Sequence, residues 1–118
     1  MASKNYFLNG VAELLILSIL KKNDTYIYDI KKIISEISND KLPMSQNTIY
    51  AAAYKLENEG KITEYAKIVG KKRTRIYYHI NETGLTYLEK LTSDYHTLTS
   101  SVGNILNFLA NDKEKKNE

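Results

Sequence analysis

Residues 45–80 read SQNTIYAAAYKLENEGKITEYAKIVGKKRTRIYYHI, and this stretch decides the fold. Its first part suits a short helix, because the hydroxyl of Ser45 can accept a hydrogen bond from an unpaired amide of the first turn and Gly60 can end the helix. Its second part suits two short strands, with Gly70-Lys71 at the point where a hairpin would turn. The stretch therefore predicts a helix followed by a two-stranded β-hairpin.

The predicted helix has two unlike faces. Small and apolar side chains form the face expected to be buried, namely Ile49, Ala52, Ala53 and Leu56. Side chains that can form hydrogen bonds occupy the other face: Gln46, Asn47, Tyr50, Tyr54 and Lys55. A helix in the major groove of DNA contacts base edges from its first turns. The residues expected in those turns are Ser45, Gln46, Asn47 and Thr48. The tyrosines and the lysine are better suited to phosphates.

The predicted hairpin is apolar on one face and basic at its turn. Its second strand alternates clearly between polar and apolar side chains from Arg75 to Ile80. The first strand alternates less clearly, because Glu64 interrupts its apolar face. The cations that can neutralise DNA phosphates beside or within the minor groove are Lys71, Lys72, Arg73 and Arg75.

The rest of the chain predicts three further helices. We expect one from Asn9 to Lys22, apolar around most of its circumference, and one from Ile27 to Ile37, with a single apolar stripe. The last begins after Asn81, which can cap it. Its apolar residues follow steps of three and four, the pattern of a helix that packs lengthwise against another: Leu88, Leu91, Tyr95, Leu98, Val102, Ile105 and Leu109.

These elements predict an α+β protein that is mainly α. Residues 6–80 form a winged helix-turn-helix domain of three helices and a two-stranded β-wing. Residues 81–110 form the C-terminal helix, and residues 111–118 form a charged tail that we expect to fray. One domain with an appended helix agrees with the length of 118 residues.

Composition excludes several classes of protein. The chain has no cysteine, which excludes disulfides and thiolate chemistry and fits the reducing cytosol. The longest apolar run, Val11 to Leu20, contains Glu13 and is too short to span a bilayer. The first residues lack the pattern of a signal peptide. We therefore expect a cytoplasmic protein that does not enter the membrane.

Positive charge is concentrated in the predicted helix and hairpin. Residues 45–80 hold seven Lys and Arg against three Glu, whereas the rest of the chain holds ten basic and eleven acidic residues. A run of charged residues is commonly a solvated surface. Each of these basic residues, taken alone, could have that role. The combination of a polar helix, a basic hairpin and a heptad helix favours nucleic-acid binding.

Catalysis has little support in the sequence. His79 and His96 lack the spacing of metal ligands, and neither adjoins an obvious nucleophile or orienting acid. Gly70-Lys71-Lys72 is not a phosphate-binding loop, because the preceding glycine and the following helix are absent. We therefore expect no enzyme activity, no metal and no cofactor. An unusual enzyme would depend on one of the two histidines.

Two other classes of function remain open alongside DNA binding. A winged-helix module can bind protein in place of DNA, but it would carry an acidic or apolar recognition face, which this sequence lacks. An enzyme would need an activity that is independent of nucleic acid. Neither explains the clustering of positive charge as well as DNA binding does.

Four motifs resemble the PadR family of winged-helix transcriptional regulators, and the short chain with one C-terminal helix resembles its shorter subgroup. The motifs are Thr48-Ile49-Tyr50, Leu-Glu-Asn-Glu-Gly at residues 56–60, Arg75-Ile76-Tyr77-Tyr78 and Glu82-Thr83-Gly84. Order and spacing agree from about residue 8 to residue 110. The sequence departs from the family at His79, where a basic residue is common, and at Ala51-Ala52-Ala53, where bulkier residues are common.

The resemblance implies a homodimeric repressor that leaves its operator when a small molecule binds or the cell is stressed. By that match Gln46, Asn47, Thr48 and Tyr50 face DNA, and Lys71, Lys72 and Arg73 form the wing contact. The heptad residues of the last helix then form the dimer interface. Two recognition helices related by a two-fold axis, about 34–36 Å apart, require a near-palindromic site on double-stranded DNA.

The resemblance also implies a sensor. Some short members of the family form a flat pore at the dimer centre, where an aromatic residue of the last helix stacks on planar hydrophobic drugs. Tyr95 matches that position, and the residues that could line the same space are Phe7, Val11, Leu14 and Leu91. The alternative is that Tyr95 is a core residue of the dimer interface.

Overall fold

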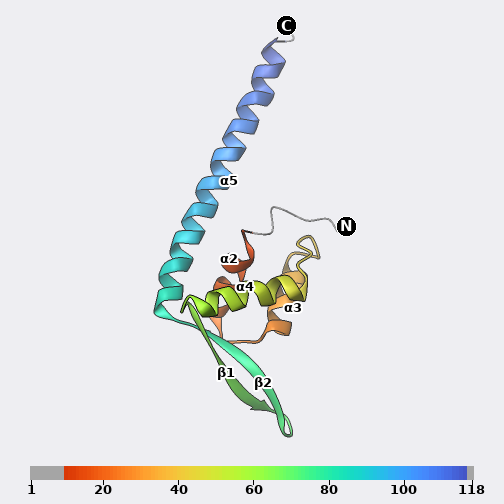
Figure 1. Ribbon diagram of the computed structural model, residues 1–118. Coiled ribbons are helices and arrows are strands. Elements are labelled where there is room, and N and C mark those ends of the chain that lie inside the picture. Colours follow the sequence, from red (N-terminus) through yellow and green to blue (C-terminus); the bar gives the residue numbers. More distant parts are fainter. Residues whose placement is uncertain (1–9, 117–118) are drawn as a thin grey trace. The chain divides into compact units, whose positions relative to one another are not determined.

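The computed structural model describes residues 10–116, and side chains up to Asn111. The elements in chain order are α2 (Ala12–Lys22), α3 (Ile27–Ile37), α4 (Gln46–Asn58), β1 (Ile62–Val69), β2 (Arg73–Ile80) and α5 (Glu82–Lys116) (Figure 1). The mainly helical winged-helix architecture with a long C-terminal helix is therefore confirmed. The chain divides into two compact units, which meet between Leu88 and Glu89.

The first unit has a small apolar core between its three helices and the base of the hairpin. Its fully buried large side chains are Ile16, Leu17, Ile30, Ile49, Leu56 and Ile62. On α3 the predicted apolar stripe buries Ile27, Ile30 and Ile34. It does not bury Ile37, which is 79% exposed because α3 ends there, at the edge of the core.

The bounds of α4 agree with the prediction from Ser45 and Gly60. The Ser45 hydroxyl accepts a hydrogen bond from the Thr48 amide at 3.1 Å, which caps the helix. Beyond the last turn, Gly60 has φ of +75°, a conformation that other residues adopt at a cost. The Lys61 amide then bonds to the Leu56 carbonyl at 2.9 Å. The chain is thereby turned directly from the helix into β1.

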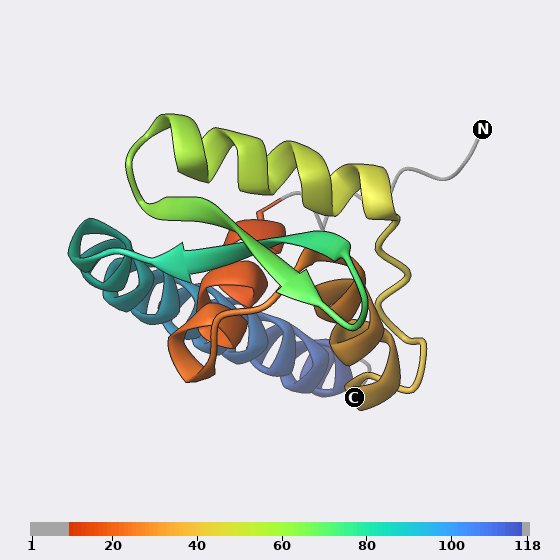
Figure 2. The ribbon, with the colours of Figure 1, turned by 90° about the horizontal axis from the view of Figure 1, so that it is seen from below.

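The wing is a two-stranded antiparallel sheet, seen below α4 in Figure 2. Its register runs from the pair Ile62–Ile80 at the base to the pair Val69–Arg73 next to the turn. The base is buried, whereas Ile68 near the tip is 73% exposed. The turn places Lys72 at φ of +61°, where a side chain is strained.

The first turns of α5 belong to the first unit. A Cβ added at Gly84 would lie 2.3 Å from the carbonyl oxygen of Lys61, the residue before β1, so the helix packs on this backbone more closely than any other residue permits. The Tyr87 hydroxyl donates to Glu13 Oε1 at 2.8 Å. The Asn81 side chain, predicted to cap α5, donates to the Gly60 carbonyl and accepts from the Thr63 hydroxyl.

The second unit is the remainder of α5. This helix continues to Lys116, past the predicted end at residue 110. Beyond the half-buried Leu91, its large apolar side chains are exposed, with values between 42% for Tyr95 and 67% for Phe108. None of the helices described is sufficiently long and apolar to cross a membrane.

Candidate nucleic-acid interface

The N-terminal turns of α4 present polar side chains to solvent, as predicted from the sequence. Gln46 and Asn47 are exposed, and Tyr50 and Tyr54 are 50% and 68% exposed. Ser45 and Thr48 differ from them, because their hydroxyl oxygens lie 3.0 Å apart within the helix cap. The hydroxyl of Ser45 is thus already engaged at the start of the helix.

Lys55 lies at the other end of α4, in an ion-paired environment. Its ammonium lies 2.9 Å from Glu13 Oε2 and 3.3 Å from Glu59 Oε2. The hydrogen bond with Glu13, followed by that with Glu59, holds the pKa of Lys55 above its ordinary value. The structure therefore does not bring this predicted phosphate ligand together with the polar N-terminal turns.

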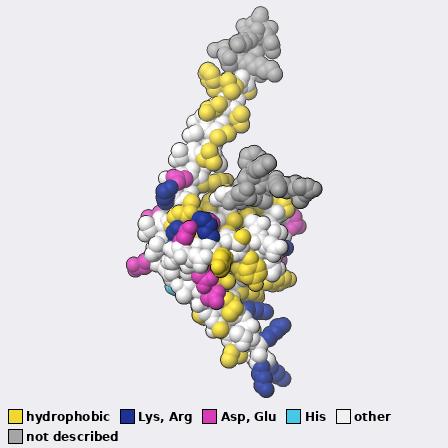
Figure 3. All heavy atoms as spheres, in the orientation of Figure 1, with side chains coloured by type: hydrophobic (Ala, Val, Ile, Leu, Met, Phe, Trp, Pro, Cys, Tyr) yellow, Lys and Arg dark blue, Asp and Glu magenta, His cyan; other side chains and the backbone are white. Residues whose placement is uncertain are grey.

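The basic residues of the wing turn form a cluster of exposed cations. Lys71, Lys72 and Arg73 are all exposed, and the ion pairs found within residues 10–116 involve none of them. In the space-filling view the dark blue cations gather at the end of the wing (Figure 3). A cluster of unneutralised cations on a projecting hairpin suits contact with a polyanion.

A groove of about 490 Å³ lies between the start of α4 and the wing. It brings together three predicted site residues, Gln46, Tyr50 and Arg75. It also includes residues not predicted as site residues, notably Tyr28, which is 63% exposed. The sequence contained a signal for the exposure of Tyr28. It follows Ile27 in an amphipathic helix, and because Ile27 belongs to the buried stripe, the next side chain points to solvent.

One acidic residue, Glu64, lines this groove, and Glu57 on α4 lies beside it. Partial burial and the neighbouring Glu64 raise the pKa of Glu57 above its ordinary value. Burial, followed by the charges of Glu64 and Glu57, raises the pKa of Tyr78 to about 12. A phosphate is disfavoured beside the Glu64 carboxylate, so an anionic partner would contact the wing turn and the part of the groove away from Glu64.

The base of the wing is tied to the rest of the unit through His79. Its Nδ1 lies 2.9 Å from Asp24 Oδ1 in the loop between α2 and α3. His79, which stands where a basic residue is common in the family that the sequence resembles, is therefore engaged with a carboxylate. No cluster of metal-ligating side chains occurs within the residues that the structure describes.

The predicted ligand-binding residues lie on two elements. Val11 and Leu14 are half-buried next to and on α2 in the first unit. Leu91 and Tyr95 are on α5 in the second unit, and Phe7 lies outside the described residues. None of the four described residues lines the apolar groove of about 410 Å³ between α2 and α3.

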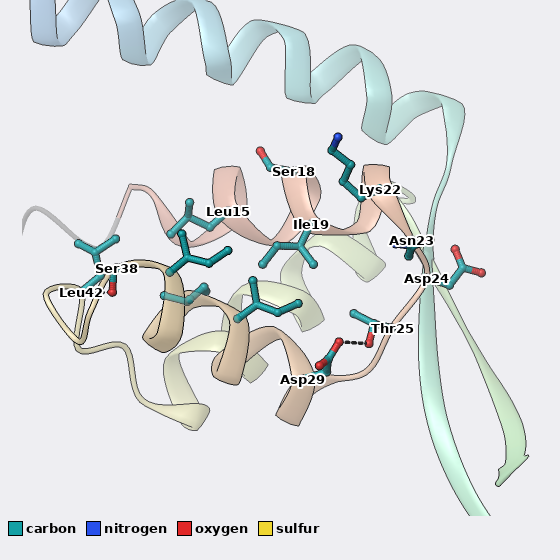
Figure 4. A pocket seen from close by; sticks show the side chains of 13 residues that line it. Leu15, Ser18, Ile19, Lys22, Asn23, Asp24, Thr25, Asp29, Ser38 and Leu42 are labelled. Carbon is teal, nitrogen blue, oxygen red and sulfur yellow. Dashed lines mark hydrogen bonds between the residues drawn. The ribbon is translucent and has the colours of Figure 1, made fainter.

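That apolar groove is shown in Figure 4. Leu15 and Leu42 lie at one end, and Thr25 and Asp29 lie at the other, joined by a 2.6 Å hydrogen bond. Lys22 points away from α3. The groove is therefore a largely apolar surface with the pair of Thr25 and Asp29 at one end and Ser38 at the other.

The predicted dimer interface divides between the two units. Leu88 is 6% exposed and lies in the core of the first unit, and Leu91 is half-buried. The remaining seam residues are exposed: Tyr95, Leu98, Val102, Ile105 and Leu109. Two further apolar residues outside the heptad steps, Leu106 and Phe108, are 61% and 67% exposed and were not predicted.

Comparison with known proteins gives concordant matches. The model of the transcriptional regulator PadR-like family matches residues 16–90. An uncharacterised protein from Lysinibacillus sphaericus is 30% identical over 88 residues, which cover 75% of this chain and 81% of that protein.

Solved structures with similar folds include three regulators. A transcriptional regulator from Clostridium thermocellum superimposes with a TM-score of 0.78 at 25% identity, covering 87% of this chain and 97% of that one. A PadR-like transcriptional regulator from Bacillus cereus gives 0.74 at 26% identity, covering 86% and 97%. Bacillus subtilis PadR in complex with operator DNA gives 0.62 at 29% identity, covering 68% of this chain and 45% of that one.

Proposed function

This chain belongs to the PadR-like family of transcriptional regulators, a family of regulators and not of enzymes, and we propose that it binds double-stranded DNA through α4 and the wing. The observation that carries this proposal is the convergence of Gln46, Tyr50 and Arg75 on one groove beside the cationic wing turn. The operator complex of Bacillus subtilis PadR supports the same mode of action.

Each part of the interface has a proposed task. Gln46 and Asn47 read base edges in the major groove, where an amide side chain can form two hydrogen bonds with adenine. Tyr50 and Tyr54 contact phosphates alongside. Thr48 lies in the first turn of α4 beside Asn47 and also faces DNA. Ser45 stabilises α4 through the helix cap, and Lys55 stabilises it through the ion pair with Glu13.

The wing turn supplies contacts that do not depend on base sequence. Lys71, Lys72 and Arg73 neutralise phosphates beside or within the adjacent minor groove, and Arg75 does so nearer the wing base. Such contacts fix the position of the protein on the duplex and provide most of its non-specific affinity.

The protein acts as a homodimer on a near-palindromic operator. The exposed apolar residues of α5, from Tyr95 to Leu109, need cover that a second copy can supply. A two-fold interface uses the same patch on both copies and places the recognition helices about 34–36 Å apart, one turn of DNA.

The dimer represses transcription by occupying a promoter in the cytoplasm, and a planar hydrophobic inducer or a stress signal releases it. Tyr95 is the aromatic residue on which an inducer would stack. In a titration with planar dyes we expect saturable fluorescence quenching that Tyr95→Ala abolishes. Quenching that persists in the variant would assign Tyr95 to the interface alone.

A DNA titration tests the proposed interface. Fluorescence anisotropy over a salt series gives a log–log slope of about −0.9 for each phosphate neutralised. We expect Arg73→Ala to weaken binding to every duplex and to make the slope shallower by about one phosphate, and Asn47→Ala to reduce base preference. Lys90→Ala, an equal change of charge in the second unit, is the matched control.

Wild-type behaviour of both interface variants would reject this DNA-contacting surface. An absence of DNA binding at low salt would favour the alternative function, a winged-helix module that binds protein.

A further inference from the structure

The carboxylate of Asp24 joins both strands of the wing to the helical core. It lies in the four-residue loop between α2 and α3. Its Oδ2 accepts a 2.7 Å hydrogen bond from the Tyr65 hydroxyl on β1, and its Oδ1 lies 2.9 Å from His79 Nδ1 on β2. A carboxylate only accepts hydrogen bonds, so both partners must donate and the His79 proton is on Nδ1.

The backbone of the same loop adds a second connection. The Tyr78 amide donates to the Thr25 carbonyl at 2.8 Å, and these residues form an antiparallel bridge. The buried Thr25 in turn donates from its hydroxyl to Asp29 Oδ2 on α3 at 2.6 Å. The loop therefore connects α3 to β2, while Asp24 provides the connection to β1.

The remaining contacts on this face of the wing are less directional. The rings of Tyr26 and Tyr77 have centroids 5.4 Å apart, and Tyr77 and Tyr65 are 5.8 Å apart. Arg75 lies 4.1 Å from the centroid of Tyr26, and Lys67 lies 4.7 Å from that of Tyr77. Stacked rings and cations tolerate sliding, whereas hydrogen bonds to a carboxylate restrict direction.

The charged form of Asp24 is favoured by its surroundings. Partial burial alone would raise its pKa, but hydrogen bonds from Tyr65 and His79, with the charges of His79 and Lys67, lower the pKa below its ordinary value. The groups that face it are thus Tyr65 and Lys67 on β1 and His79 on β2. The acceptor is kept ionised at neutral pH.

Small changes at the wing base have large effects at its tip. The seven residue steps from Ile62 to Val69 span about 23 Å at 3.3 Å per residue. A rotation of about 10° at the base would move the tip by about 4 Å on this strand length, which exceeds a hydrogen-bond distance. A two-stranded hairpin on its own is marginally stable and would not hold that direction.

We propose that Asp24 is a positioning residue that sets the direction of the wing and thereby the phosphate contacts of Lys71, Lys72 and Arg73. It acts through Tyr65 and His79 and does not touch DNA. This role rests on the proposed contact between the wing and DNA.

The direction in which Asp24→Asn changes DNA affinity tests this role. Removing a negative charge near a DNA-binding surface would by itself strengthen binding, since repulsion of phosphate is reduced. We expect the opposite, a loss of about five- to tenfold in affinity and a shallower salt slope by one or more phosphates. The matched control is Asp94→Asn, the same change on the exposed surface of the second unit, which should not weaken binding.

A double-mutant cycle separates positioning from general destabilisation. On a Lys71→Ala/Lys72→Ala background, Asp24→Asn should have little further effect, because the contacts that it directs are already lost. Tyr65→Phe, which removes one hydrogen bond and no charge, should weaken binding in the same direction but less. Thermal unfolding of each variant shows whether the fold is kept, and Tyr65→Phe decides the matter if Asp24→Asn does not fold.

Two results would overturn the proposal. Unchanged or stronger DNA binding by Asp24→Asn, with reduced binding by the wing-turn variant, would reject the role of Asp24 and leave the wing contact intact. Equal losses from Asp24→Asn in both backgrounds would show that it acts away from the wing. If the wing-turn variant bound DNA as wild type does, both the wing contact and this role of Asp24 would fail.

Discussion

The two units of the molecule differ in the exposure of their apolar side chains. In the winged-helix unit, Ile16, Leu17 and Ile30 have no exposed surface. In the distal part of α5, Leu98 is 60% exposed and Phe108 is 67% exposed. The first unit thus has a core of its own, whereas the second is a single helix whose apolar surface needs a partner to be stable in water.

Helix α5 has buried apolar side chains at its start and exposed ones further along. Leu88 and Leu109 belong to one series of three- and four-residue steps, yet Leu88 is 6% exposed and Leu109 is 54% exposed. The series therefore describes two contacts in succession, an internal one at the start of α5 and a proposed intermolecular one beyond it.

The largest effect is expected from breaking the proposed contact of the second unit. Leu98→Glu places a charge on the exposed stripe, so a dimer would have to bury it unpaired. We expect monomers at micromolar concentration and a loss of operator affinity of about a hundredfold, because two linked half-site contacts become single ones. Sedimentation and anisotropy measure these changes. Ser100→Glu, on the opposite side of the helix, should leave both unchanged.

The next largest effect is a difference in stability between the same substitution, Gly→Ala, made in each of the two units. A Cβ at Gly84 would lie 2.3 Å from the Lys61 carbonyl, so Gly84→Ala should destabilise the first unit by about 1–3 kcal/mol or more. A Cβ at Gly103 meets nothing within 4 Å, so Gly103→Ala should stabilise α5 by about 0.5–1 kcal/mol. Urea titration of both variants measures the difference. Equal effects at the two sites would contradict the close packing of Gly84.

The wing turn should show stability and DNA affinity changing in opposite directions. Lys72 has φ of +61°, a conformation that glycine adopts without the strain that a Cβ causes. Lys72→Gly should therefore raise stability by about 1 kcal/mol while weakening DNA binding by one phosphate contact. Lys71→Gly, without the positive φ, should weaken binding with no gain in stability. Unfolding curves and anisotropy distinguish the two variants.

The smallest effect concerns Glu57, whose carboxyl group lies beside that of Glu64. Burial and Glu64 raise the pKa of Glu57 above its reference value of 4.5. A carboxyl of this kind favours folding below its unfolded pKa, and that contribution is lost as the pH rises through the folded pKa. Glu57→Gln should therefore stabilise the protein at pH 7, by less than about 1 kcal/mol, and have no effect near pH 4. Melting temperatures at the two pH values test this, and a gain that persists at pH 4 would exclude the charge as its cause.

Much of the fold followed from local sequence signals. Ser45 and Gly60 bounded α4 because a cap and a left-handed residue act within one turn of the chain. The alternation from Arg75 to Ile80 placed the second strand, and Tyr78 and Ile80 of its apolar face are buried, whereas Ile76 is 42% exposed. Such signals require no knowledge of distant contacts.

The features that were missed depend on contacts between distant residues. Lys55 appeared free to meet a phosphate, but Glu13 lies 42 positions earlier in the chain and binds it. Likewise, the pairing of Asp24 with Tyr65 and His79 joins residues 41 and 55 positions apart, and no periodicity reveals it. Ile37 continued the apolar stripe of α3 but is 79% exposed, because α3 ends there. Tertiary context decided each of these cases.

We propose that two winged-helix units, held together through their distal α5 segments, bind DNA as a dimer. The most direct test is the affinity and stoichiometry of the intact protein on the DNA upstream of its own gene, titrated over a salt series beside unrelated DNA. We expect two copies on each site, preference for the upstream DNA and affinity that falls steeply with salt. An absence of binding to either DNA at low salt, or one copy bound equally weakly to both, would contradict it.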